Sequence, residues 1–284
     1  MKNYLLKKRT ADQQTMMSNK TSSLPSDRSL EEGRVSQTIF FFTTFILLFI
    51  STFAQAKTIE ADYSVEFGIV GEVAKVYATL TSDKKYYKID ATVSALGIAK
   101  VVTQNLKERH ISKGHIVNGM LVTHMYQMIK SYGEYTSTTI YKVDHKKKRV
   151  TRQYKKWKYD KLVTDRKARL DYYGKDDMMT LFLNLPKHIK DKNKPKKYRF
   201  TAVGADRKNG RVDVTIPSPN TLKKIKALVD KGKAGDWFTK VVMHRKLYQS
   251  KKGELDVRIG QEGLLEKAVL KDLIFFGDVR IIKQ

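Results

Sequence analysis

The chain after residue 56 alternates between apolar and polar residues. Within 59–67 the odd-numbered residues are apolar and the even-numbered ones polar, a period of two that predicts a strand with one buried face. A glycine-bounded break follows at 68–71, and the alternation returns at 74–80 and at 87–95. Three consecutive strands with short connections predict an antiparallel meander.

Turn-forming residues recur between the later extended segments. Asn118 and Gly119 suit the positive φ angles of a tight hairpin turn, and polar or glycine-containing turns separate the other segment pairs. The pattern predicts about ten to twelve strands. The predicted hairpins pair 107–116 with 121–130, 134–143 with 149–158, 198–203 with 212–216, and 238–248 with 255–259, and a last β-rich segment covers 264–282.

Two short segments, 178–185 and 222–229, have the apolar spacing of a helix instead. Each is bounded by residues that commonly cap or end helices. We expect these helices to plug the open end or the concave face of the sheet. The expected caps and stops are Asp176 or Asp177 and Pro186 for the first helix, and Asn220 and Gly232 for the second.

These elements predict a mainly β fold. A long antiparallel meander does not stay flat, because strand twist makes it curl into a barrel or a half-barrel. No alternation of strands with helices indicates a nucleotide-binding sheet. The expected architecture is therefore a curled meander, closed or half-closed, with two short helices.

The least polar stretch of the chain lies before this body, at 38–56. Residues 35–56 hold no charge, and Ala54-Gln55-Ala56 has the small-x-small pattern that signal peptidase accepts. We interpret 1–37 as a polar leader, 38–56 as the apolar region and cleavage site of a signal peptide, and 57–284 as a single β-rich domain. Two alternatives stay open, since residues 35–56 are long enough for an inner-membrane anchor or for a buried core helix. Met16 or Met17 is an alternative start.

An export signal predicts that the body works outside the cytosol. The chain has no cysteine, which excludes lipid attachment as a lipoprotein and also excludes disulfide bonds. The stability of the folded body therefore depends on its hydrophobic core. The formal charge of +27 predicts attraction to anionic surfaces. Charge alone does not choose between phosphate polymers, lipid head groups and acidic glycans.

Four short segments together resemble the DUF3108 family of exported bacterial proteins. They occur in the family's order and spacing, and the resemblance covers most of 58–284. It implies a periplasmic β-rich protein and carries over no activity or catalytic residue. A departure is His124, where the family often has a proline. The segments are Tyr63-Ser-Val-Glu-Phe-Gly-Ile-Val-Gly-Glu72, Tyr86-Tyr-Lys-Ile-Asp-Ala-Thr92, Gly114-His-Ile-Val-Asn-Gly-Met-Leu121 and Asp177-Met-Met-Thr-Leu-Phe-Leu183.

Sequence motifs for catalysis are absent. The chain has no Gly-x-Ser-x-Gly, no His-Glu-x-x-His and no Walker-type glycine loop, and no thiol. We therefore expect a protein that is not an enzyme and that carries no cofactor.

His115 and His124 are weak candidates for a metal site. If Asn118 and Gly119 centre the hairpin, His115 faces Val122 and His124 faces Lys113, which puts the histidines diagonally across one sheet face, about 7–8 Å apart. A zinc ion needs further ligands, and a lysine beside the pair repels a cation. Two solvated or hydrogen-bonded histidines are the simpler interpretation, so no metal is expected.

The segment 146–169 is the most basic part of the chain, with twelve Lys or Arg in twenty-four residues and interleaved aromatic residues. In a cytoplasmic protein this pattern is typical of single-stranded nucleic-acid binding, but export argues against it. Anionic lipid or glycolipid head groups suit lysine with interfacial tryptophan and tyrosine; a solvated basic hairpin is the simpler alternative. The candidate surface comprises Lys146, Lys147, Lys148, Arg149, Arg152, Tyr154, Lys155, Lys156, Trp157 and Lys158.

Three function classes follow. The first is a non-enzymatic binding module, whose concave apolar face holds a lipid or another amphipathic anionic ligand while the protein associates at least transiently with the membrane. The second is a structural or assembly protein that docks on anionic membrane surfaces or on partner proteins. The third is an unrecognised hydrolase. We expect anionic lipid or envelope glycolipid as the partner and no nucleic acid; protein partners are not indicated by the sequence.

Overall fold

The structure is a computed structural model that describes residues 56–205, 209–243, 253–273 and 277–284. The described residues all belong to one compact unit. The predicted leader and all of the apolar stretch 38–56 except Ala56 lie outside the described residues. The export signal and the alternative membrane anchor therefore stay predictions.

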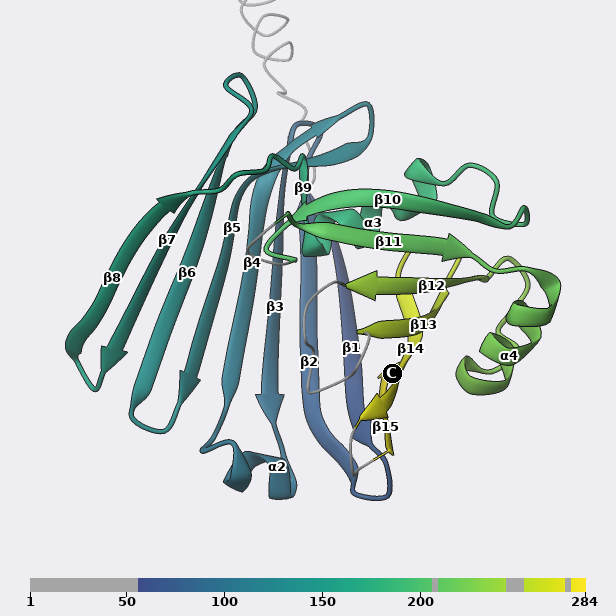
Figure 1. Cartoon of the computed structure of the whole chain (residues 1–284), viewed down its shortest axis with the longest axis horizontal. Helices are drawn as coiled ribbons and strands as arrows, with labels where there is room; N and C mark the ends of the chain where they lie inside the picture. Colours follow the sequence, from purple (N-terminus) through teal and green to yellow (C-terminus); the bar gives the residue numbers. More distant parts are fainter. Residues whose placement is uncertain (1–55, 206–208, 244–252, 274–276) are drawn as a thin grey trace, which may run out of the picture. The chain divides into compact units, whose positions relative to one another are not determined.

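The described residues form one sheet of fifteen strands (Figure 1). β1 to β8 make a continuous antiparallel meander, and the remaining strands pair antiparallel except for β9, which is parallel to β10. The first eight strands are β1 Lys57–Phe67, β2 Gly71–Ser82, β3 Tyr86–Ala95, β4 Lys107–Val117, β5 Met120–Tyr132, β6 Tyr135–Asp144, β7 Arg149–Lys158 and β8 Lys161–Arg169. The others are β9 Asp176–Asp177, β10 Lys196–Val203, β11 Arg211–Ile216, β12 Trp237–Met243, β13 Glu254–Ile259, β14 Leu265–Leu273 and β15 Gly277–Lys283.

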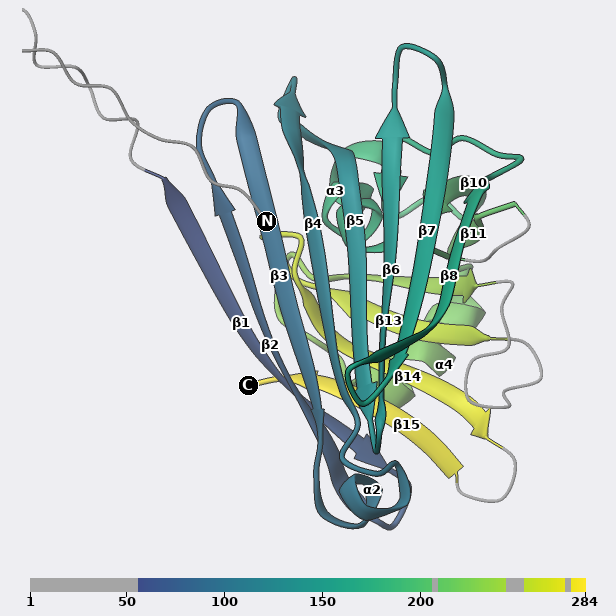
Figure 2. The ribbon, with the colours of Figure 1, turned by 90° about the vertical axis from the view of Figure 1, so that its left-hand side faces the viewer.

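The two halves of the sheet are joined where β1 pairs with β15. Tyr63 lies opposite Lys283 and Phe67 opposite Val279 in an antiparallel register. Figures 1 and 2 show the two halves running in different directions on either side of this joint. The strand order ends at β8 on one side and β9 on the other, so within the described residues the sheet is open. The mainly β, curled antiparallel fold is confirmed, and the closed barrel is not formed.

The described residues contain three helices, α2 Gly97–Val102, α3 Met178–His188 and α4 Pro219–Val229. The two predicted helices are α3 and α4; α2 was not predicted, because it is one short turn-like segment between β3 and β4. Asp177 caps α3, as expected, through a capping box with Thr180. Pro186 does not end α3 but lies in its last turn, where a missing N–H costs a single hydrogen bond.

The cap of α4 differs from the prediction. Ser218, and not Asn220, is the N-cap residue, and Pro219 occupies the first turn. Proline fits this position because its fixed φ is already helical and its missing N–H has no partner there in any helix. The pair Ser218-Pro219 is thus a stronger start signal than the asparagine that follows it.

More strands form than the sequence predicted. β8 was not identified because its side chains are mostly exposed and charged, so no apolar alternation marks it. β9 has two residues, too short for any periodic signal. The hairpin centred on Asn118 and Gly119 is confirmed, and both residues have positive φ angles of 50° and 74°.

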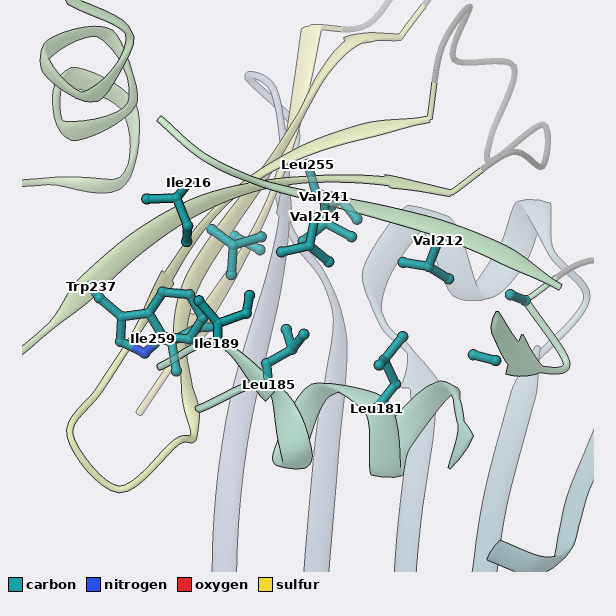
Figure 3. Packing of buried hydrophobic residues seen from close by; sticks show 14 of the residues in the cluster. Leu181, Leu185, Ile189, Val212, Val214, Ile216, Trp237, Val241, Leu255 and Ile259 are labelled. Atoms are coloured by element: carbon teal, nitrogen blue, oxygen red, sulfur yellow. The ribbon is translucent and has the colours of Figure 1, made fainter. Parts of the chain in front are cut away.

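α3 packs its apolar stripe against the second half of the sheet. Leu181 and Leu185 are almost fully buried and belong to the same core cluster as Val212, Val214 and Val241 of β11 and β12 (Figure 3). The opposite side of α3 contacts the first half, where its Met179 and Leu183 pack on a smaller cluster from β3 and β5. α3 therefore ties the two halves of the sheet together.

None of the helices in the described part of the chain is long and apolar enough to cross a membrane.

Candidate functional site

A cavity of about 1120 Å³ lies between α3 and the face of the sheet that α3 covers. Side chains from both halves of the sheet form its walls, among them Ile59 of β1, Val257 of β13 and Ile281 of β15, with Phe182 of α3. Most of this lining is apolar. Typical small-molecule pockets measure about 300–1000 Å³, so the cavity has room for a long alkyl chain.

A row of alanines forms part of the cavity lining. Ala61, Ala78 and Ala91 lie directly opposite one another on β1, β2 and β3, and all three line the cavity. The neighbouring row on the same face carries Leu80 and Ile89. Side chains on one face of a strand repeat every second residue. The alternation that identified these strands in the sequence therefore also places the three alanines on the face that lines the cavity.

One wall of the cavity is polar. Glu108 of β4 accepts a hydrogen bond of 3.0 Å from Lys130 and lies 3.3 Å from Nε2 of His110. Nδ1 of His110 is 2.9 Å from the hydroxyl of Tyr126. The hydrogen bond from His110, together with Lys130, lowers the pKa of Glu108 to about 2, although burial acts in the opposite direction. Glu108 is therefore an ionised carboxylate with its charge compensated.

The series Tyr126, His110 and Glu108 is the feature of the cavity that most favours an enzyme. A histidine held between a carboxylate and a hydroxyl is the arrangement by which general bases are oriented. Glu108, however, is shared with Lys130, and the Tyr126 side chain is almost fully buried. The sequence analysis did not identify these residues. The pattern that could have revealed them is the presence of polar side chains on the buried face of β4 and β5.

Cationic and aromatic residues continue this wall onto β6 and β7. Arg152 and Tyr154 line the cavity, and the Arg152 guanidinium lies 5.2 Å from the Tyr154 ring centre. Lys156 follows at the next position on the same face, with Nζ 3.8 Å from the ring centre of Tyr135. Tyr141, opposite Arg152, stacks on Tyr126.

The remaining residues of the predicted anionic surface lie elsewhere. Strand alternation directs Lys155 and Trp157 to the opposite face of β7, where Lys155 pairs with Asp165 at 3.4 Å. The three lysines 146–148 lie in the turn before β7, and Lys158 ends that strand. The two ends of a ten-residue strand are separated by about 30 Å. The ten residues thus occupy two faces and one turn, and their binding to anionic surfaces stays a prediction.

The capping carboxylate of α3 is held by the sheet. Asp177 is fully buried and accepts hydrogen bonds from the hydroxyls of Ser112 and Thr123, the latter at 2.9 Å, and from the backbone N–H of Met179 and Thr180 at 2.8 and 3.1 Å. Burial raises the pKa of Asp177, while these hydrogen bonds act to lower it. This network fixes the N-terminus of α3 over β4 and β5.

A second contact fixes the middle of α3 to the same hairpin. The Asn184 amide donates to the carbonyl oxygen of Leu121 at 2.9 Å and accepts from the Leu121 N–H at 3.0 Å. The same amide donates to Asp176 at 2.5 Å. Asp176 and Asp177 therefore have a structural role, in agreement with the predicted helix cap.

His124 does not lie where the sequence placed it. His115 faces Val122, as predicted, but Lys113 pairs with Met125 because a β-bulge shifts the register next to Lys113. His124 is the extra residue of this bulge. The predicted diagonal arrangement is therefore wrong, and the two histidines are closer than it implied.

Three histidine rings meet at the bulge. The ring centres of His115 and His124 are 4.5 Å apart, with a hydrogen bond between the rings, and the ring centre of His145 is 5.2 Å from that of His124. Both nitrogens of His145 are engaged, at 2.7 Å each, with the hydroxyl of Tyr173 and the carbonyl oxygen of Thr123. Within the described residues no group of three or more His, Asp or Glu side chains is arranged to hold a metal ion.

One end of the sheet carries most of the exposed apolar side chains. The α2 segment, the β1–β2 turn, the β5–β6 turn and the β7–β8 turn lie along this end, at the lower edge of Figure 1. Backbone hydrogen bonds from Leu96 to Val73, from Gly133 to Gln104 and from Tyr159 to Glu134 join these segments in series. The exposed apolar residues here are Ile69, Val70, Ile98, Val101, Val102, Tyr159, Leu162 and Val163.

Comparisons with known proteins show likeness in fold alone. No family model matches the chain, and no curated protein matches it. Among solved structures, it is similar to the crystal structure of a β-barrel-like protein of the domain of unknown function DUF1849 from Brucella abortus, with a TM-score of 0.42 and 7% sequence identity, over 81% of this chain and 95% of that chain. The resemblance to DUF3108 stays a prediction.

Proposed function

We propose that the chain is an exported, non-enzymatic binding protein of the cell envelope that holds a lipid or another amphipathic anionic molecule beneath α3. The observation that supports this proposal is the mostly apolar cavity of about 1120 Å³. An apolar interior with a few polar groups on one side is typical of sites that bind a hydrophobic body and orient a polar end.

The position of α3 adds to this argument. The helix covers the cavity with Met178, Met179, Phe182 and Leu183. Methionine side chains are flexible and fit irregular apolar surfaces. Such a cover suits alkyl chains of varying length better than one rigid molecule.

Mass spectrometry of the natively purified protein tests the proposal. Protein isolated from the envelope fraction without detergent should carry an amphipathic molecule that is released by organic extraction. N-terminal sequencing of the same sample locates the mature start and tests the export signal. An empty protein that also fails to bind any alkyl-chain compound added to it would contradict the proposed function.

A docking protein is the second candidate, and the apolar end of the sheet favours it. Ile69 and Val101 are 104% and 77% exposed, in a turn and a short helix that contribute no side chain to the main core cluster. Aliphatic side chains on protruding segments suit insertion into a membrane interface or a contact with a partner protein. Both functions are compatible in a protein that exchanges a ligand with a membrane.

Hydrolysis is tested with the same material. Incubation with short- and long-chain esters, followed by product analysis, should leave the esters intact. Turnover that is lost on His110→Gln would instead assign the cavity to an enzyme.

A further inference from the structure

Arg152 is the cation of the cavity that lacks a partner. Its Nε is buried and has no hydrogen-bond partner among the described residues. Within the same residues no carboxylate lies within ion-pair distance of its guanidinium, which lies over the Tyr154 ring, 5.2 Å from the ring centre. Arg152 as a whole is partly buried, and the face of an aromatic ring compensates such a cation only in part.

The other charged side chains of the cavity are compensated. Glu108 is paired with Lys130 at 3.0 Å and bonded to His110. Arg152 therefore gives the cavity a positive charge that the protein itself does not neutralise, and an unpaired charge in apolar surroundings is unfavourable.

Register places this charge at one side of the cavity. Arg152 lies opposite Tyr141, which in turn lies opposite Tyr126. The apolar wall formed by Ile59 and Ile281 belongs to β1 and β15, which are six and seven strands from β7 in the sheet order. A ligand that fills the cavity thus meets the cation near β7 and apolar side chains near the joint of the two halves.

We propose that Arg152 binds the anionic head group, a carboxylate or a phosphate monoester, of a single-chain amphiphile whose alkyl chain extends from β7 toward β1 and β15. This inference rests on the proposed function, because it assigns the orientation and charge of the ligand in the same cavity. The planar guanidinium suits both anions, since it donates two parallel hydrogen bonds to adjacent oxygens.

Calorimetric titration of the delipidated protein with three ten-carbon compounds tests this assignment. Decanoate and decyl phosphate carry the two proposed head groups, and decanol carries none. The wild type should bind the better anion about 10-fold or more tightly than decanol. Arg152→Gln should remove this preference while decanol binding stays unchanged. The tighter-binding compound of decanoate and decyl phosphate identifies the head group that the cavity prefers.

Lys155→Gln is the matched control. It removes one positive charge from the same strand, but Lys155 faces away from the cavity and pairs with Asp165. The affinities of this variant should equal those of the wild type. A similar loss in Lys155→Gln and Arg152→Gln would mean that net charge, and not Arg152, causes the preference, which overturns the inference.

Two further outcomes separate the inference from the proposed function. Equal binding of decanol and both anions by the wild type, unchanged in Arg152→Gln, overturns the role of Arg152 and leaves the cavity as an apolar site. Binding of none of the three compounds contradicts the proposed function itself. If Arg152→Gln does not fold, Arg152→Lys replaces it; this variant keeps the charge, loses the planar fork and should retain only part of the preference.

Discussion

Thr123 of β5 donates a hydrogen bond of 2.9 Å to Asp177, the residue that caps α3. The hydroxyl also accepts a bond of 3.1 Å from the Asp177 N–H. Thr123→Val keeps the shape of the side chain but leaves a buried carboxylate and a buried N–H with fewer partners, and we expect a loss of about 1–3 kcal/mol in the free energy of unfolding. Urea denaturation measures it. Thr92→Val on β3, outside this network, should change stability by less than about 0.5 kcal/mol; equal effects would mean that the Asp177 contact is not specific.

Filling the cavity from its alanine row should abolish ligand binding. Ala78→Phe places a large side chain between Ala61 and Ala91, where it occupies space available to an alkyl chain. We expect a loss of cis-parinaric acid fluorescence enhancement with stability unchanged or raised. The control is Ala168→Phe on the exposed edge strand β8. Binding that survives in Ala78→Phe would place the ligand elsewhere.

The ionised state of Glu108 should stabilise the fold above mildly acidic pH. Its folded pKa of about 2 lies below the ordinary value of 4.5, so its contribution is present above about pH 4.5 and is lost as the pH falls toward 2. Glu108→Gln is expected to cost about 1–2 kcal/mol at pH 7 and to flatten the stability profile in that window. Denaturation at several pH values tests this, with the exposed Glu262→Gln as control. An unchanged acid profile in Glu108→Gln would contradict the ion-pair assignment.

The histidine cluster should weaken the fold on acidification. Burial, and then the neighbouring His115 and His145, lower the pKa of His124. A lowered histidine pKa means that the neutral ring is favoured in the folded state, so stability is lost as the pH falls from about 6.5 through the folded value. His124→Asn should therefore be relatively more stable than the wild type at pH 5 than at pH 7.5. Identical pH profiles for the two proteins would show that the cluster does not resist protonation.

The apolar end of the sheet should bind lipid vesicles. Val101→Ser with Val102→Ser removes two exposed aliphatic side chains from α2 and is expected to reduce vesicle cosedimentation several-fold. Val117→Ser, exposed in the Asn118–Gly119 hairpin, should have no effect. Binding that is equal in all variants and disappears at high salt would point to the basic residues instead.

Much of the fold was readable from local pattern. Alternation located β1 to β3, and Asn118-Gly119 located the β4–β5 hairpin, because a period of two and a pair with positive φ angles are properties of neighbouring residues. β8 was not predicted, because a charged edge strand has no buried face and so no apolar alternation in its sequence. The bulge at His124 was not predicted, because the pairing register of a strand depends on its partner strand.

The cavity could not be predicted from any single segment of the sequence. Its walls combine Ile59 with Val257 and Ile281, and these residues meet only because β1 pairs with β15. Arg152 appeared in the sequence as one of many basic residues. What distinguishes it is that strand alternation directs it inward while Lys155 points outward, which becomes informative once the covered face of the sheet is known.

The pairing of β1 with β15 also has a consequence for biosynthesis. Asp62 accepts a backbone hydrogen bond of 2.9 Å from Gln284, so β1 pairs with a strand that is synthesised much later than β1 itself. Closing so long a loop is slow, and until then β1 presents an unpaired edge that other chains are able to join. We expect a chain truncated before residue 277 to aggregate, because it lacks the strand that covers this edge of β1.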